Sequence, residues 1–207
     1  MSGHVLVLAA GRLPKEGIPS WLLDAPSLVI GCDGGWKHAE TLGVHVACIL
    51  GDLDSMGQGP DGVECIALPD QDASDLTKVL MWCAQHHPDL PVHVVGLDGG
   101  RLDHRLAVPA ALIEAKSDAV LHTNGGDLRR ISPGQLHAVP SQADMIIGLH
   151  PFGEVIVKRL DGVTWPLEEV VLSTGTRGIH NVATGHEVHI HLTVGDLVMS
   201  RSRDHLA

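Results

Sequence analysis

Up to about residue 125, this 207-residue chain alternates short aliphatic runs with segments of helical periodicity. This alternation is typical of parallel α/β structure, in which each strand is followed by a helix. Most of the runs are apolar at consecutive positions, as expected for strands that are covered on both faces. The runs that we predict to be strands are Val5–Ala9, Leu28–Ile30, Val46–Leu50, Val63–Leu68 and Val92–Val95.

Two helices are expected in this part of the chain. The first runs from about Ala73 to His87, because its apolar residues recur at the spacing of one buried stripe, and Asp72 or Ser74 can cap it. The second runs from roughly Arg101 to Ala115, and Pro109 should kink or divide it because proline lacks a backbone N–H.

The character of the chain changes after Asn124-Gly125-Gly126, where short β runs are separated by glycine and proline. We place a domain boundary near residues 125–132, with an all-β module behind it. The runs in this module are Met145–Ile147, Val155–Val157, Val188–Leu192 and Leu197–Met199.

Composition excludes several classes of protein. With 44% hydrophobic and 19% charged residues, the chain is not intrinsically disordered. A net charge of -11 disfavours a large surface for nucleic acid or anionic membrane, but it permits a small anionic ligand held through divalent cations. The four cysteines lie far apart, and the chain shows neither a secretory signal nor a membrane-spanning apolar stretch. We therefore expect a cytoplasmic protein with reduced thiols.

Acidic residues and glycines follow four of the predicted strands, at the strand ends where open α/β sheets bind ligands. The chain has neither a phosphate-binding P-loop nor a dinucleotide-binding glycine motif, so any phosphates must be held differently. Two acidic strand ends in succession concentrate negative charge, which favours a bound cation. The four segments are Asp33–Gly35, Gly51–Ser55, Asp70–Lys78 and Gly96–His104.

Three of these segments also have a simpler interpretation. Asp52 and Asp54 can turn towards one Mg²⁺ ion, yet a solvated acidic turn fits them equally well. Asp75 and Lys78 lie three residues apart at a helix start, where an acid and an ion pair are common without any ligand. Arg101 can engage a phosphate with its planar fork, although a tight turn before a capped helix gives the same pattern.

In this order, the four segments resemble those of the thiamine pyrophosphokinase (thiamine diphosphokinase) family. The resemblance extends through Gly162–Leu167 and Gly178–Asn181, which look like that family's vitamin-binding segments. It implies an α/β fold with an N-terminal Rossmann-like, mostly parallel sheet domain over residues 1–127, which binds nucleotide. A C-terminal all-β sandwich domain over residues 128–207 would bind thiamine and form a homodimer.

Members of this family transfer a diphosphate from ATP to the hydroxyl of thiamine, releasing AMP, and they require Mg²⁺. The resemblance therefore implies site residues of three kinds. The implied metal ligands are Asp52, Asp54 and Asp75. The residues that would hold the phosphates or complete the acidic site are Gln71, Lys78, Arg101, Asp33 and Asp103, with Asp103 near the attacking hydroxyl. The residues in the implied thiamine pocket, which is built across the dimer interface, are Trp165, His180 and Asn181.

The sequence departs from the family pattern near the acceptor. His180 stands where relatives usually carry serine, and an imidazole changes both the volume and the donor pattern of the pocket. An acceptor such as a hydroxymethylpterin is therefore an alternative. Two further alternatives are a nucleotide or thiamine diphosphate binding protein without turnover and a metal-dependent phosphohydrolase.

Overall fold

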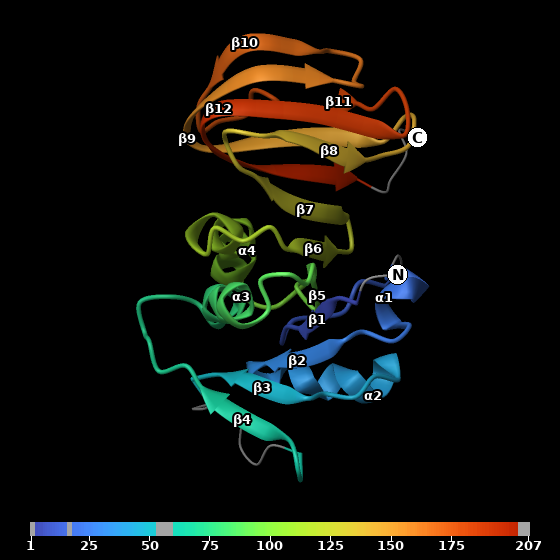
Figure 1. Cartoon of the computed structure of the whole chain (residues 1–207), viewed down its shortest axis with the longest axis vertical. Coiled ribbons are helices and arrows are strands. Elements are labelled where there is room, and N and C mark those ends of the chain that lie inside the picture. The colour runs from blue at the N-terminus through green and yellow to red at the C-terminus, as the bar shows by residue number, and fades with distance from the viewer. Residues whose placement is uncertain (1–2, 16–17, 53–59, 203–207) are drawn as a thin grey trace. The chain divides into compact units, whose positions relative to one another are not determined.

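The computed structural model describes residues 3–15, 18–52 and 60–202 of the chain. The chain forms two compact units, Met1–Asn124 and Gly125–Ala207 (Figure 1). Among the described residues, no helix has both the length and the apolar character that crossing a membrane requires.

The first unit contains a sheet of six strands whose pairings are all parallel. Its strand order is β6-β5-β1-β2-β3-β4, so the order reverses between β1 and β5. The strands are β1 (Val5–Leu8), β2 (Leu28–Cys32), β3 (Cys48–Gly51), β4 (Glu64–Ala67), β5 (Val92–Val95) and β6 (Val120–Thr123).

Helices lie on both sides of this sheet, with α3 and α4 together on one side and α1 and α2 on the other (Figure 1). This arrangement buries β1 completely and confirms the α/β class. The helical elements are α1 (Ser20–Leu23), the short 3-10 helix η1 (Asp33–Lys37), α2 (His38–Leu42), α3 (Asp75–His86) and α4 (Leu102–Glu114).

Local chemistry fixes the start of α3. The Ser74 hydroxyl accepts a hydrogen bond from the Thr77 backbone N–H, which is the geometry of a helix N-cap. Val79, Leu80 and Cys83 are fully buried, as the predicted stripe requires.

Two sequence-based expectations for this unit are wrong. Pro109 does not divide the second helix, because α4 runs without interruption from Leu102 to Glu114, whereas the alternative, a kink at Pro109, stays a prediction. Strand β4 is not covered on both faces: it lies at the edge of the sheet, and its residues are mostly exposed. Cys65, on β4, is consequently exposed and does not behave as a small core residue like the other three cysteines.

In the second unit, the secondary structure of the described residues consists of strands, and these strands pair in antiparallel fashion. Along the sheet the order is β10-β9-β12-β7, with β8 paired to β12 and β11 paired to β9. The strands are β7 (Gly126–Ile131), β8 (Leu136–Pro140), β9 (Ile146–Asp161), β10 (Leu167–Leu172), β11 (Asn181–Val182) and β12 (Glu187–Ser202).

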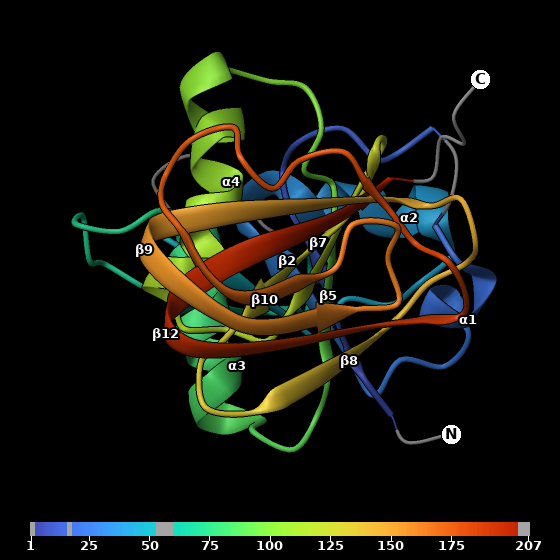
Figure 2. The same ribbon diagram turned by 90° about the horizontal axis from the view of Figure 1, so that it is seen from above.

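Strands β9 and β12 are each 16 residues long and curve strongly (Figure 2). Their pairing shifts register between His191 and Asp196, which is where irregularities bend a strand. The runs expected as separate strands at Val188–Leu192 and Leu197–Met199 are therefore two halves of β12. Buried aliphatic side chains from both halves of β9 and β12 pack into one core.

Candidate active site

A cavity of about 720 Å³ opens at the carboxyl ends of β1 and β5, where the strand order reverses. Open α/β sheets bind ligands at such a point because the chains leaving the two strands turn away in opposite directions. The described lining lies entirely in the first unit. It includes seven of the eight residues that the sequence assigns to a metal and phosphate site, namely Asp33, Asp52, Gln71, Asp75, Lys78, Arg101 and Asp103. The eighth, Asp54, lies outside the described residues.

Small residues let the two central strand ends approach each other. A Cβ at Gly11 would lie 2.6 Å from the carbonyl oxygen of Gly96, and a Cβ at Gly96 would lie 2.2 Å from that of Ala9. Gly96 also has a φ of +82°, which L side chains rarely adopt. Sequence reasoning did not select Ala9-Ala10-Gly11, which also lines the cavity. A run of small residues directly after the first strand could have indicated it.

Asp33 enters the cavity from the start of η1, directly after β2. Its φ of +48° is in the left-handed region, which is uncommon for a residue other than glycine. Gly35 makes this turn possible, because a Cβ there would lie only 1.9 Å from the Leu8 carbonyl oxygen. This backbone places Asp33 in the lining of the cavity, beside Gly51 at the end of β3.

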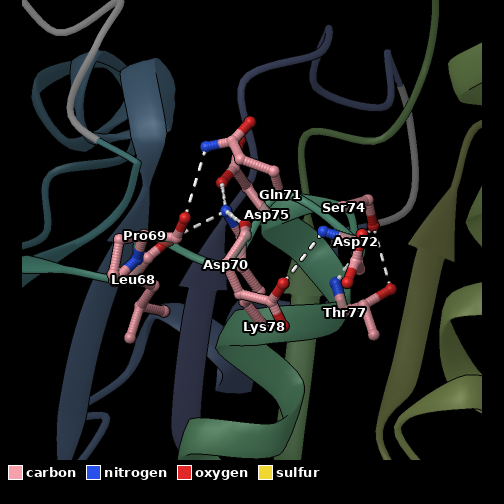
Figure 3. A network of polar contacts seen from close by, with 9 residues as sticks. All are labelled: Leu68, Pro69, Asp70, Gln71, Asp72, Ser74, Asp75, Thr77 and Lys78. Carbon is pink, nitrogen blue, oxygen red and sulfur yellow. Dashed lines mark hydrogen bonds and ion pairs between the residues drawn. The ribbon is translucent and has the colours of Figure 1, made fainter.

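The segment before α3 forms a tight turn at the cavity (Figure 3). The Asp72 backbone N–H donates to Asp70 Oδ1 at 2.9 Å, a side-chain bond that mimics a backbone turn. Gln71, at the tip of this turn, is exposed, and its Nε2 donates a long 3.4 Å hydrogen bond to the Pro69 carbonyl. The amide of Gln71 is thus available to a ligand.

Lys78 lies behind this turn (Figure 3). Its Nζ donates hydrogen bonds of 3.0 Å to the carbonyl oxygens of Leu68 and Asp70, and it lies 2.7 Å from Asp75 Oδ1. Only 7% of the Lys78 side chain is exposed, against 31% for Asp75. One buried ammonium therefore connects the turn before α3 to the first residue of that helix.

Asp75 Oδ1 is buried and makes no hydrogen bond with proper geometry among the described residues, so its close neighbour is the Lys78 ammonium. Together with Asp33 and Asp52, it supplies a third carboxylate to the cavity. No described set of three carboxylate, imidazole or thiol groups is already arranged around a metal position. Mg²⁺ commonly takes one or two protein carboxylates and completes its shell with phosphate oxygens and water, so this donor set fits it.

Arg101 and Asp103 form an exposed pair at the mouth of the cavity. Arg101 Nε donates to Asp103 Oδ1 at 3.1 Å, and Arg101 Nη2 donates to Asp103 Oδ2 at 2.5 Å. The hydrogen bonds from Arg101 lower the pKa of the Asp103 carboxyl to about 2, and the backbone N–H of His104 adds to this effect. Asp103 is consequently ionised at neutral pH and is a weak base while this pair persists.

Cys32 also lines the cavity, although sequence reasoning did not select it as a site residue. Burial strongly raises the pKa of its thiol, and the nearby carboxylates of Asp75 and Asp33 raise it further. The thiol therefore stays protonated and does not act as a nucleophile.

The three residues of the expected thiamine pocket lie in the second unit. Asn181 is buried; its Nδ2 donates to the Trp165 carbonyl at 2.7 Å, and its Oδ1 accepts from the Trp165 N–H at 3.1 Å. This pair of bonds fixes the Trp165 backbone while 57% of that residue stays exposed. His180, just before Asn181, has a φ of +65°.

The family model described as thiamin pyrophosphokinase, catalytic domain, matches residues 20–122, which include the metal and phosphate residues named above. The chain belongs to the thiamin pyrophosphokinase family. Membership confirms the resemblance and the prediction of an enzyme. No curated protein sequence matches the chain significantly.

Solved structures of the family share the fold along nearly the whole chain. The Bacillus subtilis thiamine pyrophosphokinase is similar with a TM-score of 0.78 and 24% identity, covering 97% of this chain and 99% of that one. A thiamin pyrophosphokinase family protein from Enterococcus faecalis has a TM-score of 0.78 at 18% identity, covering 98% and 100%. Yeast thiamin pyrophosphokinase has a TM-score of 0.70 at 16% identity, covering 98% and 87%.

Proposed function

We propose that the cavity at the ends of β1 and β5 binds ATP with Mg²⁺ and that the enzyme transfers the terminal diphosphate to the hydroxyl of thiamine, releasing AMP. The observation that carries this proposal is the convergence of Asp33, Asp52 and Asp75 on one cavity, next to Gln71 and Arg101. These residues come from four strand ends within the segment that matches the family's catalytic model.

Asp52, Asp54 and Asp75 are the residues that would hold Mg²⁺, and the buried, unbonded Oδ1 of Asp75 supports this assignment. When bound, the ion neutralises charge on the phosphates. Gln71 Nε2 and the Arg101 guanidinium donate hydrogen bonds to phosphate oxygens, for which Arg101 exchanges its Asp103 partner. These contacts supply position and charge stabilisation, which dominate phosphoryl transfer.

The reaction itself needs little covalent help from the protein. The acceptor hydroxyl oxygen forms a bond to the β-phosphorus, the bond from that phosphorus to the bridging α,β-oxygen breaks, and AMP leaves with the bridging oxygen. Asp103 is placed to accept a hydrogen bond from the attacking hydroxyl, whose proton passes to solvent. Asp33 completes the acidic edge of the cavity.

The second unit, as the β-sandwich domain of the family, would supply the thiamine pocket and the homodimer interface. Its support is the pair of hydrogen bonds by which Asn181 fixes Trp165, because this leaves an exposed indole on a rigid backbone. Such an indole can stack on an aromatic ring of the acceptor. We expect the dimer to act in the cytoplasm, where its cysteines, all free, stay reduced.

The test is AMP and thiamine diphosphate formation by purified protein given ATP, Mg²⁺ and thiamine, with a chelator control. Asp52→Asn should lower turnover by at least about 100-fold, since it removes several kcal/mol of electrostatic stabilisation. Asp89→Asn is the matched control, because Asp89 is exposed and does not line the cavity. Unchanged turnover in Asp52→Asn would refute the site.

A second acceptor is favoured by His180, whose imidazole stands in place of a hydroxyl. Mass analysis of the product with a hydroxymethylpterin as the acceptor separates the two readings. Nucleotide binding without AMP release from any acceptor would instead indicate a binding protein, and phosphate release with water alone would indicate a hydrolase.

A further inference from the structure

We propose that Lys78 is a positioning residue: its ammonium fixes the turn that carries Gln71 and the carboxylate of Asp75, and it does not bind the phosphates. This inference rests on the proposed function, because it assigns a role within the same cavity. It differs from the role that the family resemblance implies for this lysine.

The ammonium group of Lys78 is already surrounded by protein oxygens. A lysine ammonium has three N–H donors and no acceptor. At Lys78, two of them make 3.0 Å hydrogen bonds to the carbonyl oxygens of Leu68 and Asp70. Asp75 Oδ1 lies 2.7 Å from Nζ and is the ion-pair partner of the ammonium, although without hydrogen-bond geometry (Figure 3). Three protein oxygens therefore already surround the ammonium, and a phosphate oxygen would have to displace one of them.

Burial also restricts the movement of the Lys78 side chain. The Lys78 side chain is 7% exposed, and its neighbours Thr77, Val79 and Leu80 on α3 are fully buried. Turning the ammonium towards a phosphate would leave two backbone carbonyls without their donor and Asp75 without its ion-pair partner. Arg101, in contrast, has a side chain that is 75% exposed at the mouth of the cavity. The exposed guanidinium is the better phosphate contact.

The Lys78 ammonium connects the turn before α3 to the start of that helix. The carbonyls of Leu68 and Asp70 belong to the turn that presents Gln71, and Asp75 is the first residue of α3. Both Gln71 and Asp75 line the cavity. Lys78 therefore sets the position of an amide donor and a carboxylate relative to each other, which explains why a cation is buried there.

The test compares Lys78→Met with Arg101→Met. For Lys78→Met we expect kcat to fall at least 100-fold, with the KM for ATP and the calorimetric Kd for Mg²⁺-free AMP changed less than 3-fold. For Arg101→Met we expect the Kd for Mg²⁺-free AMP to rise at least 10-fold. A rise of 10-fold or more in Kd for Lys78→Met, with kcat retained, would overturn the proposal. Lys158→Met, at an exposed residue of β9 in the other unit, is the control and should change neither value.

A second measurement uses the unmodified enzyme, so it holds even if Lys78→Met does not fold. Labelling with an amine-reactive reagent, read by peptide mass, should modify Lys78 slowly and at the same rate with and without ATP. Labelling of Lys78 in the free enzyme as fast as that of the exposed Lys158 would show that the carbonyls of Leu68 and Asp70 do not hold the ammonium, and it would overturn the proposal. Because binding and labelling need no turnover, failure of the enzyme to make thiamine diphosphate refutes the proposed function without deciding the role of Lys78.

Discussion

At the scale of single residues, two ion pairs that line the cavity differ in their burial. Asp75 pairs with Lys78 and Asp103 pairs with Arg101, but the first pair is buried and the second is exposed. The buried Lys78 ammonium also donates hydrogen bonds to two carbonyl oxygens. The Arg101–Asp103 pair is exposed, so water competes with it, and the proposed contact of Arg101 with a phosphate costs little. The two cations therefore have different roles, although both lie next to an aspartate.

The exposed pair predicts an unusual titration. The Asp103 carboxyl should titrate at about pH 2 in the free enzyme, because Arg101 hydrogen-bonds its ionised form. In Arg101→Gln we expect its pKa to return towards the ordinary aspartate value of about 3.9. Carboxyl ¹³C NMR across an acid titration measures both. Because the folded-state pKa is lowered, any stability from the pair is present above about pH 4 and is lost as the pH falls towards 2.

An Asp103 that titrates at its ordinary value in the unmodified enzyme would show that the pair does not persist in solution. Arg101→Lys serves as the control, because it keeps the positive charge but loses the bidentate fork and should give an intermediate pKa.

At the scale of elements, a chain of hydroxyl groups links the start of α3 to α4. Thr77 Oγ1 donates to Glu114 Oε2 at 3.0 Å, so the Ser74 hydroxyl donates to Thr77 Oγ1 at 2.9 Å and in turn accepts from the Thr77 N–H. The sequence predicted a cap at Asp72 or Ser74, because capping is decided by neighbouring residues, and the structure has Ser74. It did not predict the link to Glu114, because 37 residues separate it from Thr77.

Thr77→Val should therefore lower the free energy of unfolding by about 1–2 kcal/mol, since it removes the buried hydroxyl at almost constant volume. Urea unfolding measures the change. Glu114→Gln keeps an acceptor oxygen for Thr77 and should cost less than half as much. Equal stability of Thr77→Val and the unmodified protein would show that the link contributes nothing.

Two neighbouring glycines of η1 make a sharp comparison. A Cβ at Gly35 would lie 1.9 Å from the Leu8 carbonyl oxygen, whereas at Gly34 the nearest atom would be the Ala10 Cβ at 3.9 Å. We expect Gly35→Ala to lower the free energy of unfolding by at least about 2 kcal/mol and Gly34→Ala to change it by less than about 0.5 kcal/mol. Thermal unfolding compares them, and similar losses in both variants would contradict the close packing of η1 on β1.

At the scale of the whole molecule, the sequence predicted what local patterns determine. The aliphatic runs predicted β1 to β5, and the rule for strand ends predicted that acidic segments far apart in the sequence share one cavity. It did not predict the exposure of β4, because which strand lies at an edge depends on strand order. Nor did it predict the continuity of β9 and β12, because the bend in each is set by pairing between the two strands. The sequence also did not predict that the Lys78 ammonium donates to the carbonyl oxygens of Leu68 and Asp70, because this depends on the fold of the turn before α3.

The central claim is that this cavity moves an intact diphosphate group from ATP to the acceptor. The most direct measurement uses ATP labelled with ³²P at the γ position, together with Mg²⁺ and thiamine. The account predicts that the label enters thiamine diphosphate in the same amount as the AMP released and that Asp52→Asn abolishes both. Label recovered as inorganic phosphate, or ADP formed in place of AMP, would contradict it.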